Sequence, residues 1–354
     1  MATLPVTSGL APPGRSPHSR AMSPSLSDRP PDAPAPGTPA AVFCTAPELG
    51  LLAFSGPDAE PFLQGQLSND LKTLAPGSVQ LSSYNSAKGR MLATLLIWRD
   101  GPESFRALVA ADLAETLRKR LSMFVLRSKL TVTDRSSADR VLGMGGARAR
   151  DAVHAVFGAV PAAGHVQVGE TTTIVALPDG RLFVVAPAAL AESLRSNLAT
   201  AATEVSSEVW RWLGIRAGMP MIVAATQDLF VPQTANWDLL GGVSFHKGCY
   251  TGQEIIARTQ YLGRLKERMH LFHADGAIPP PATRLYGAVF GDQACGTVVD
   301  AAPAPDGGCD LLAVLQLTAL EGALHLAAPD GPAMALLPLP YSLPAPIAPG
   351  RPKL

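Results

Sequence analysis

The sequence has few of the residues from which disulfide frameworks, metal centres and membrane spans are built. Its 354 residues include 4 cysteines, and no two of them form a C-x-x-C pair. This spacing argues against a disulfide framework and against an iron–sulfur cluster held by one chain alone. No uninterrupted apolar run reaches membrane-spanning length, so we expect no membrane segment. A reducing compartment fits best, and we expect a cytoplasmic protein.

Net charge is also absent. The 29 Lys and Arg residues balance 29 Asp and Glu residues, so we expect no direct nucleic-acid binding by a diffuse basic surface. The sequence contains no Walker A run and no G-x-S-x-G elbow. His270 and His273 lie three apart in a predicted strand and therefore point to opposite faces. His246-x-x-Cys249 lacks a third ligand, so no metal site is expected.

The two ends of the chain differ from the rest in composition. Residues 1–40 contain 10 prolines and almost no large apolar side chains, which predicts a disordered tail. An alternative is an organellar transit peptide, because Arg15 and Arg20 precede the first acid, Asp28. The protein would then belong in the mitochondrial matrix. Residues 346–354 are Pro-rich and are predicted to be frayed.

Between these tails the patterns predict three units. Residues 41–138 show the order strand, helix, hairpin, strand, helix, strand, which is typical of an α+β domain with helices on one face of an antiparallel sheet. A similar order recurs in residues 139–267. Residues 268–345 contain short apolar runs separated by Pro and Gly, which predict a small β-barrel.

The most informative stretch is Lys247-Gly248-Cys249-Tyr250-Thr251-Gly252-Gln253-Glu254. Thr251-x-x-Glu254 before two isoleucines has the spacing of a capping box, so we expect a helix to start at Thr251. The thiol of Cys249 would then precede a helix N-terminus and lie two residues from Lys247, and both features favour a thiolate. A buried structural cysteine is the alternative.

This run resembles the signature of the YgfZ family, folate-binding proteins related to the glycine-cleavage aminomethyltransferase (T-protein). Other blocks match in order from about Val42 to about Leu343, among them residues 62–70, 87–91, 230–233, 240–245 and 339–343. The resemblance implies two pseudo-repeated α/β folate-binding subdomains that enclose a cleft, followed by a small C-terminal β-barrel. It also implies tetrahydrofolate or a derivative as cofactor, with iron–sulfur assembly factors or client proteins as partners.

By resemblance, Trp210 matches a tryptophan assigned to folate binding, and an indole plane can stack on a pterin. The alternative is that Trp210 belongs to an ordinary core stripe with Leu213 and Ala217. The family's other such tryptophan falls at Leu49 here. Arg216, on the same predicted helix, is a candidate to bind a carboxylate or to cap the helix C-terminus.

Several polar residues are candidates for the wall of the cleft. They are Asn236, Lys247, Tyr250, Gln253 and Arg258. For Arg258 the alternative is an intrahelical pair with Glu254. Lys88, in a predicted hairpin turn, is a candidate to attract the anionic tail of a folate, or is simply an exposed turn charge.

One absence bears on activity. Aligned through residues 85–91, the adjacent aspartates of the aminomethyltransferase, the first of them catalytic, fall at Leu92 and Ala93, which cannot transfer a proton. The leading hypothesis is therefore a folate-binding accessory protein for iron–sulfur cluster assembly or repair, with Cys249 as its central group. The alternatives are a folate-dependent one-carbon transferase and an adaptor for tRNA-modifying enzymes.

Overall fold

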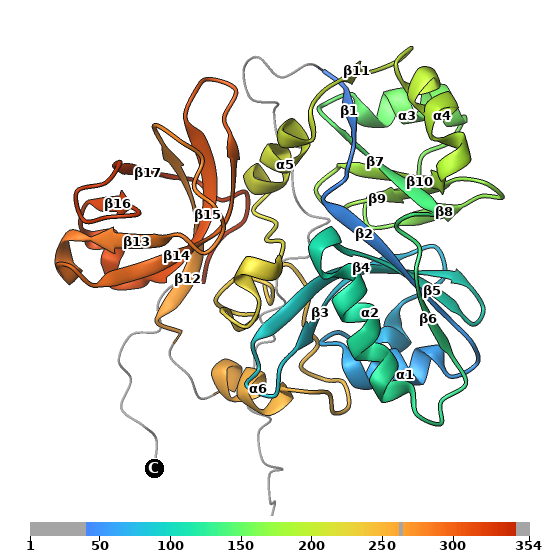
Figure 1. Ribbon diagram of the computed structural model, residues 1–354, viewed down its shortest axis with the longest axis horizontal. Helices are drawn as coiled ribbons and strands as arrows, with labels where there is room; N and C mark the ends of the chain where they lie inside the picture. Colours follow the sequence, from blue (N-terminus) through green and yellow to red (C-terminus); the bar gives the residue numbers. More distant parts are fainter. Residues whose placement is uncertain (1–39, 262–264, 345–354) are drawn as a thin grey trace, which may run out of the picture.

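The computed structural model describes residues 40–261 and 265–344. The predictions for residues 1–39 and 346–354 lie outside this part of the chain. Three sheets dominate the fold, two stacked along one side and the third set apart on the other (Figure 1). This arrangement confirms the expected mixed architecture of two α/β units and a C-terminal β unit.

The first sheet is antiparallel and carries its two helices on one face. The central strands of this sheet are buried over most of their length, on both faces. In spatial order the strands are β3 (Val79–Asn85), β4 (Met91–Gly101), β5 (Ser104–Ala110), β2 (Leu49–Ser55) and β6 (Thr131–Asp134), and the helices are α1 (Ala59–Gln66) and α2 (Ala111–Val125).

The second sheet repeats this plan with shorter elements. Its helices are α3 (Ala149–Phe157) and α4 (Ala191–Leu198). Its strands, in spatial order, are β11 (Thr203–Glu204), β1 (Val42–Thr45), β7 (Asp139–Gly145), β10 (Leu182–Pro187), β9 (Thr173–Ala176) and β8 (Val166–Val168). Strand β1 falls within residues 41–138, the predicted first unit, yet it pairs with β7. The chain therefore starts in the second sheet and crosses to the first before β2.

The third sheet is a curled half-barrel, in the region where we expected a small β-barrel. Its six strands end in two edges, β16 and β17, within the described residues. In spatial order they are β16 (Leu324–Leu326), β13 (Arg284–Gly287), β14 (Ala294–Pro303), β15 (Cys309–Gln316), β12 (Glu267–Ala274) and β17 (Met334–Leu337). A register shift between Val298 and Asp300 bends β14.

Helix α5 (Ser207–Arg216) connects the second sheet to the third, where two aspartates bind its polar side chains. Arg211 donates through Nε to Asp300 at 2.7 Å, and the indole of Trp212 donates to Asp310 at 2.8 Å. Helix α6 is Gln253–Tyr261. The short 3-10 turns are Leu71–Thr73, Ala188–Leu190, Ala224–Thr226, Ala288–Phe290 and Leu317–Glu321.

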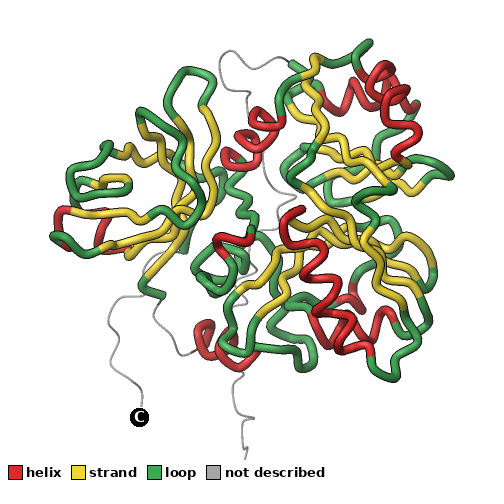
Figure 2. Tube along the Cα trace, viewed as in Figure 1, coloured by secondary structure: helices red, strands yellow, loops and turns green. Residues whose placement is uncertain are grey.

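A long connection between α5 and α6 contains little regular structure but is packed into the core (Figure 2). Phe230, Trp237 and Leu240 within it are buried. The indole of Trp237 lies against Gly242, where an added Cβ would come within 2.2 Å of its Nε1. Glycine at this position is therefore a packing requirement.

Replacing Gly242 with alanine should lower the free energy of unfolding by about 1–3 kcal/mol, because Trp237 must move to admit the methyl group. Gly65→Ala is the matched control, since an added Cβ there meets nothing within 4 Å and the residue lies in α1. That control should be neutral or raise stability by about 0.5–1 kcal/mol. Urea unfolding of both variants measures the difference, and equal stabilities would contradict the packing argument.

Candidate functional site

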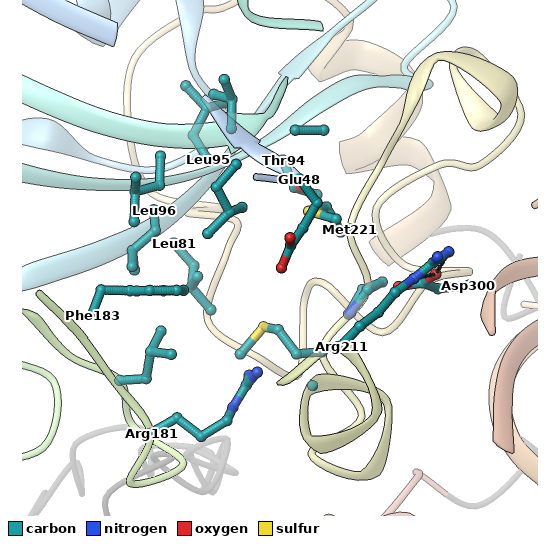
Figure 3. Close-up of a pocket in the computed structure, with 18 of the residues that line it drawn as sticks. Glu48, Leu81, Thr94, Leu95, Leu96, Arg181, Phe183, Arg211, Met221 and Asp300 are labelled. Atoms are coloured by element: carbon teal, nitrogen blue, oxygen red, sulfur yellow. Dashed lines mark hydrogen bonds and ion pairs between the residues drawn. The ribbon is translucent and has the colours of Figure 1, made fainter. Parts of the chain in front are cut away.

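A pocket opens where the three sheets meet. Its walls come from β3, β4 and β5 of the first sheet, from β10 and α5, and from β14 of the third sheet. The lining is mostly apolar and includes Leu81, Leu96, Phe183 and Met221, which Figure 3 labels, together with Trp210 and Trp237. An apolar concave site with a few polar groups, at a junction between units, is the usual setting for a small organic ligand.

Trp210 lines this pocket, as the folate interpretation requires, but its ring is already in contact with the protein. Gly143 lies against the indole, since an added Cβ would stand 2.6 Å from Cδ2. The guanidinium of Arg181 lies 4.7 Å from the ring centroid, and Phe183 meets the ring edge to face at 5.0 Å. Trp210 therefore forms a fixed wall, and a ligand stacked on its face would first have to displace Arg181.

The charged groups of the pocket were missed by sequence reasoning. Arg181 donates to Asp179 at 2.7 Å, and Arg211 pairs with Asp300. Glu48, from the turn between β1 and β2, is the fourth charged residue of the lining, beside Arg181, Arg211 and Asp300. Burial is the largest cause of the raised pKa of Glu48, and Arg211 opposes it. In the sequence, a single acidic residue after a proline is typical of an exposed turn. The pocket position of Glu48 becomes evident only in the structure, where the chain crosses from the second sheet to the first.

The motif around Cys249 lies elsewhere, at the tip of the β3–β4 hairpin. Gly252 packs against this tip so closely that an added Cβ would come within 2.4 Å of the Ser86 carbonyl oxygen and 2.8 Å of the Gly89 Cα. The helix starts at Gln253 instead of Thr251, because Gly252, with φ +82°, accepts from the amide of Ile256 at 3.3 Å. The predicted capping-box start is therefore wrong by two residues.

Cys249 is exposed, in contrast to Cys44, Cys295 and Cys309, which are buried. Lys88 and Arg258 are exposed, and Gln253 is half-buried. Arg258 forms no ion pair with Glu254 among the described residues. None of these residues lines the pocket that contains Trp210. The predicted single site is thus two places, an apolar pocket and a surface motif.

Comparisons with known proteins agree with this architecture. A family model described as the GCVT N-terminal domain matches residues 40–179. The tRNA-modifying protein YgfZ of Serratia proteamaculans (strain 568) is 35% identical over 303 residues, which cover 84% of this chain and 91% of that protein. Its counterpart from Klebsiella pneumoniae (strain 342) is 32% identical, over 84% and 92%. The chain belongs to the YgfZ family.

The fold has a solved counterpart. The crystal structure of the glycine cleavage system aminomethyltransferase T from Bartonella henselae superposes with a TM-score of 0.70, at 14% identity, over 85% of this chain and 86% of that one. At this identity the likeness establishes the fold alone. The GcvT-like architecture expected for a YgfZ protein is therefore confirmed.

Lys247, in the YgfZ motif, is buried and acts away from Cys249. Its ammonium group donates to the carbonyl oxygens of Gln64, Leu67 and Asn69 at 2.6, 2.5 and 3.0 Å. It also lies 4.9 Å from the ring centroid of Tyr250. Burial lowers the pKa of Lys247 to about 8 and raises that of Tyr250 to about 12. The three N–H groups of the Lys247 ammonium are all used in these bonds, which hold the end of α1. Lys247 therefore has a structural role in this geometry and does not point its charge at Cys249.

Two other candidates also serve the fold. The amide of Asn236 donates to the carbonyl oxygen of Met269 at 2.8 Å and to the hydroxyl of Tyr341 at 3.3 Å. Arg216 lies 3.5 Å from Asp310 of the third sheet. Neither lines the pocket. The carboxylate that Arg216 was expected to bind is therefore one of the protein's own.

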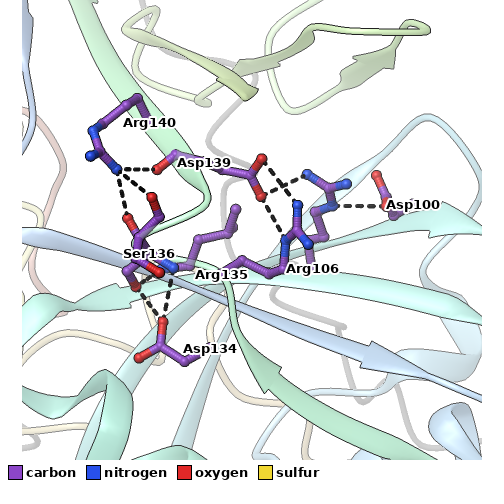
Figure 4. Close-up of polar contacts among 9 residues, drawn as sticks. Asp100, Arg106, Asp134, Arg135, Ser136, Asp139 and Arg140 are labelled. Atoms are coloured by element: carbon purple, nitrogen blue, oxygen red, sulfur yellow. Dashed lines mark hydrogen bonds and ion pairs between the residues drawn. The ribbon is translucent and has the colours of Figure 1, made fainter. Parts of the chain in front are cut away.

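A further charged cluster lies at the seam between the two α/β sheets (Figure 4). Asp139, at the start of β7, accepts from Arg135 at 2.9 Å and lies 3.8 Å from Arg106, which donates to Asp100 at 2.8 Å. Acidic and basic side chains alternate here, so the ion pairs of the cluster stabilise the contact between the two sheets.

Across the described residues, no group of three His, Cys, Asp or Glu side chains could hold a metal ion, and no helix could span a membrane.

Replacing Lys247 with methionine should lower the free energy of unfolding by about 2–4 kcal/mol, because carbonyl oxygens at the end of α1 would be left without a donor. Lys88→Met removes the same charge from an exposed turn and should change stability by less than about 0.5 kcal/mol. Denaturant unfolding of both variants provides the measurement. A Lys247 variant as stable as the Lys88 variant would show that the three carbonyls do not need this donor.

Proposed function

We propose that this YgfZ protein binds tetrahydrofolate or a derivative in the pocket between its three sheets. The observation that carries the proposal is the pocket itself, apolar, walled by Trp210 and Phe183, and set at the junction of a GcvT-like fold. Aromatic and aliphatic walls suit the flat ring system of a pterin. The anionic tail of the ligand would extend toward the mouth of the pocket.

We further propose that folate binding supports an accessory role in iron–sulfur cluster assembly or repair, with Cys249 as the reacting thiol. Cys249 is the exposed member of four free cysteines and stands outside the pocket. A thiol in this position can reach a partner protein, whereas buried thiols are inert. The partners would be assembly factors or client proteins that present a cluster or a cysteine.

Two alternatives are less well supported. A one-carbon transferase needs an acid–base group in its pocket wall, and the aligned hairpin positions hold Leu92 and the buried Ala93. A role in tRNA modification is favoured by the name of the YgfZ relatives, tRNA-modifying protein. Because the protein has no net charge, we propose that any such role proceeds through modifying enzymes rather than through direct RNA binding.

Calorimetric titration of tetrahydrofolate tests the pocket. Wild-type protein should bind, and Trp210→Phe should weaken binding by about 3–10-fold, since the smaller ring leaves part of the ligand without contact. Trp98→Phe is the matched control, because Trp98 is buried in β4 and lies outside the pocket. Absence of binding by the wild-type protein would refute the folate proposal.

Cys249→Ser should abolish complementation of a strain that lacks its own copy of the protein, read out as the activity of an iron–sulfur enzyme. Tetrahydrofolate affinity should stay at the wild-type value, because Cys249 is not part of the pocket lining. Cys295→Ser, at a buried thiol, controls for the loss of any cysteine. Full complementation by Cys249→Ser would rule out the thiol mechanism.

A further inference from the structure

Among the described residues that line the pocket, Glu48 is the one charged side chain without an ion pair. Arg181 is neutralised by Asp179, and Arg211 by Asp300. Glu48 forms no ion pair in this part of the chain. The pocket as a whole therefore has one uncompensated negative charge.

The backbone around Glu48 is fixed. Its carbonyl oxygen accepts from the amide of Ala111, the first residue of α2, at 2.8 Å, and the amide of Leu49 donates to the carbonyl oxygen of Ala46 at 3.1 Å. The turn is thus held at both ends. The carboxylate points into the open centre of the pocket, across from Arg181 (Figure 3). A group anchored in this way is preorganised for a ligand.

The carboxylate of Glu48 is partly shielded from water, and the hydrogen-bond donor that acts on it within the protein is its own backbone amide. Leu49, Leu95 and Met221 line the pocket beside it. The charged groups that face it are Arg181, Arg211 and Asp300, and the thiol of Cys44 lies near enough for Glu48 to help raise its pKa. A carboxylate shielded from water is stabilised most by a ligand that donates hydrogen bonds to it.

We propose that Glu48 recognises the buried end of the ligand, and that this end is a neutral or cationic ring with two adjacent N–H donors. A carboxylate accepts two parallel N–H bonds from such an edge. The 2-amino-4-oxopyrimidine edge of a pterin has this arrangement. An anionic end, such as the glutamate of a folate, would meet the charge of Glu48 and so remains at the mouth of the pocket. This inference rests on the proposed folate function and adds the orientation of the ligand and the residue that sets it.

Three probes separate the two ends of the ligand. Tetrahydrofolate contains both ends, tetrahydrobiopterin keeps the ring and lacks the glutamate tail, and p-aminobenzoylglutamate keeps the tail and lacks the ring. Calorimetry on Glu48→Gln, which keeps the shape and removes the charge, should show about 10–100-fold weaker binding of both ring-containing probes. Glu103→Gln, at an exposed turn, is the matched control and should bind all probes like the wild type.

The outcomes distinguish the two proposals. If the wild-type protein binds tetrahydrofolate and Glu48→Gln binds both ring-containing probes equally well, the Glu48 inference is wrong and the folate function stands. Loss of p-aminobenzoylglutamate binding alone would also overturn it, since the tail would then be the buried end. If the wild-type protein binds no tetrahydrofolate, both proposals fail. Thermal melting and a Glu48→Asp variant, expected to retain part of the affinity, guard against an effect of misfolding.

The pH dependence provides a second readout. Because the pKa of Glu48 is raised, its charge is lost at a higher pH than that of an ordinary glutamate. The affinity of the wild-type protein for tetrahydrobiopterin should therefore fall as the pH is lowered through that pKa, relative to Glu48→Gln. The thiol of Cys44, whose pKa burial raises to about 12, titrates far above this range. A slope that persists unchanged in Glu48→Gln would assign the titration to Asp300 and contradict the inference.

Discussion

The crossing of the chain between its two α/β sheets is the constraint on which the pocket depends. Strand β1 pairs with β7 of the second sheet, and after a turn of three residues β2 pairs with β5 of the first. The amide of Ala46 donates to the carbonyl oxygen of Val141 at 3.0 Å, which fixes the turn to the second sheet as it leaves. The two sheets therefore cannot move apart without breaking one of these ladders. The side chains that face each other across the seam keep their spacing for the same reason.

The β3–β4 hairpin connects the two functional places of the molecule. Its middle residues, Leu81 and Thr94, line the pocket, whereas its tip packs against Gly252 of the motif. Thr94 lies three residue steps along β4 from Met91, a path of about 10 Å. This separation argues against direct chemistry between the thiol and a ligand in the pocket. It favours two separate roles, in which the ligand stabilises the β3–β4 hairpin and the thiol of Cys249 reacts with a partner protein.

Sequence reasoning recovered the architecture because the periodic patterns and the family blocks cover most of the chain. It singled out Trp210, which lines the pocket, but not the contacts of its ring, since Gly143 and Arg181 are distant from Trp210 in sequence. It assigned Lys247 to Cys249 from proximity in sequence, whereas the ammonium turns inward to carbonyls about 180 residues earlier in the chain. The pocket position of Glu48 could not be predicted, because it depends on the pairing of β1 with β7, which no local sequence pattern encodes.

The third sheet has a consequence for how the protein is made. Asp300, the partner of Arg211 in the pocket wall, lies on β14, near the end of the chain. During synthesis on the ribosome, domains fold in order from the N-terminus. The nascent chain would thus present an open pocket with an unpaired arginine until the last third has emerged. The ion pair between Arg211 and Asp300, and with it that part of the pocket wall, is therefore completed only after β14 has been synthesised.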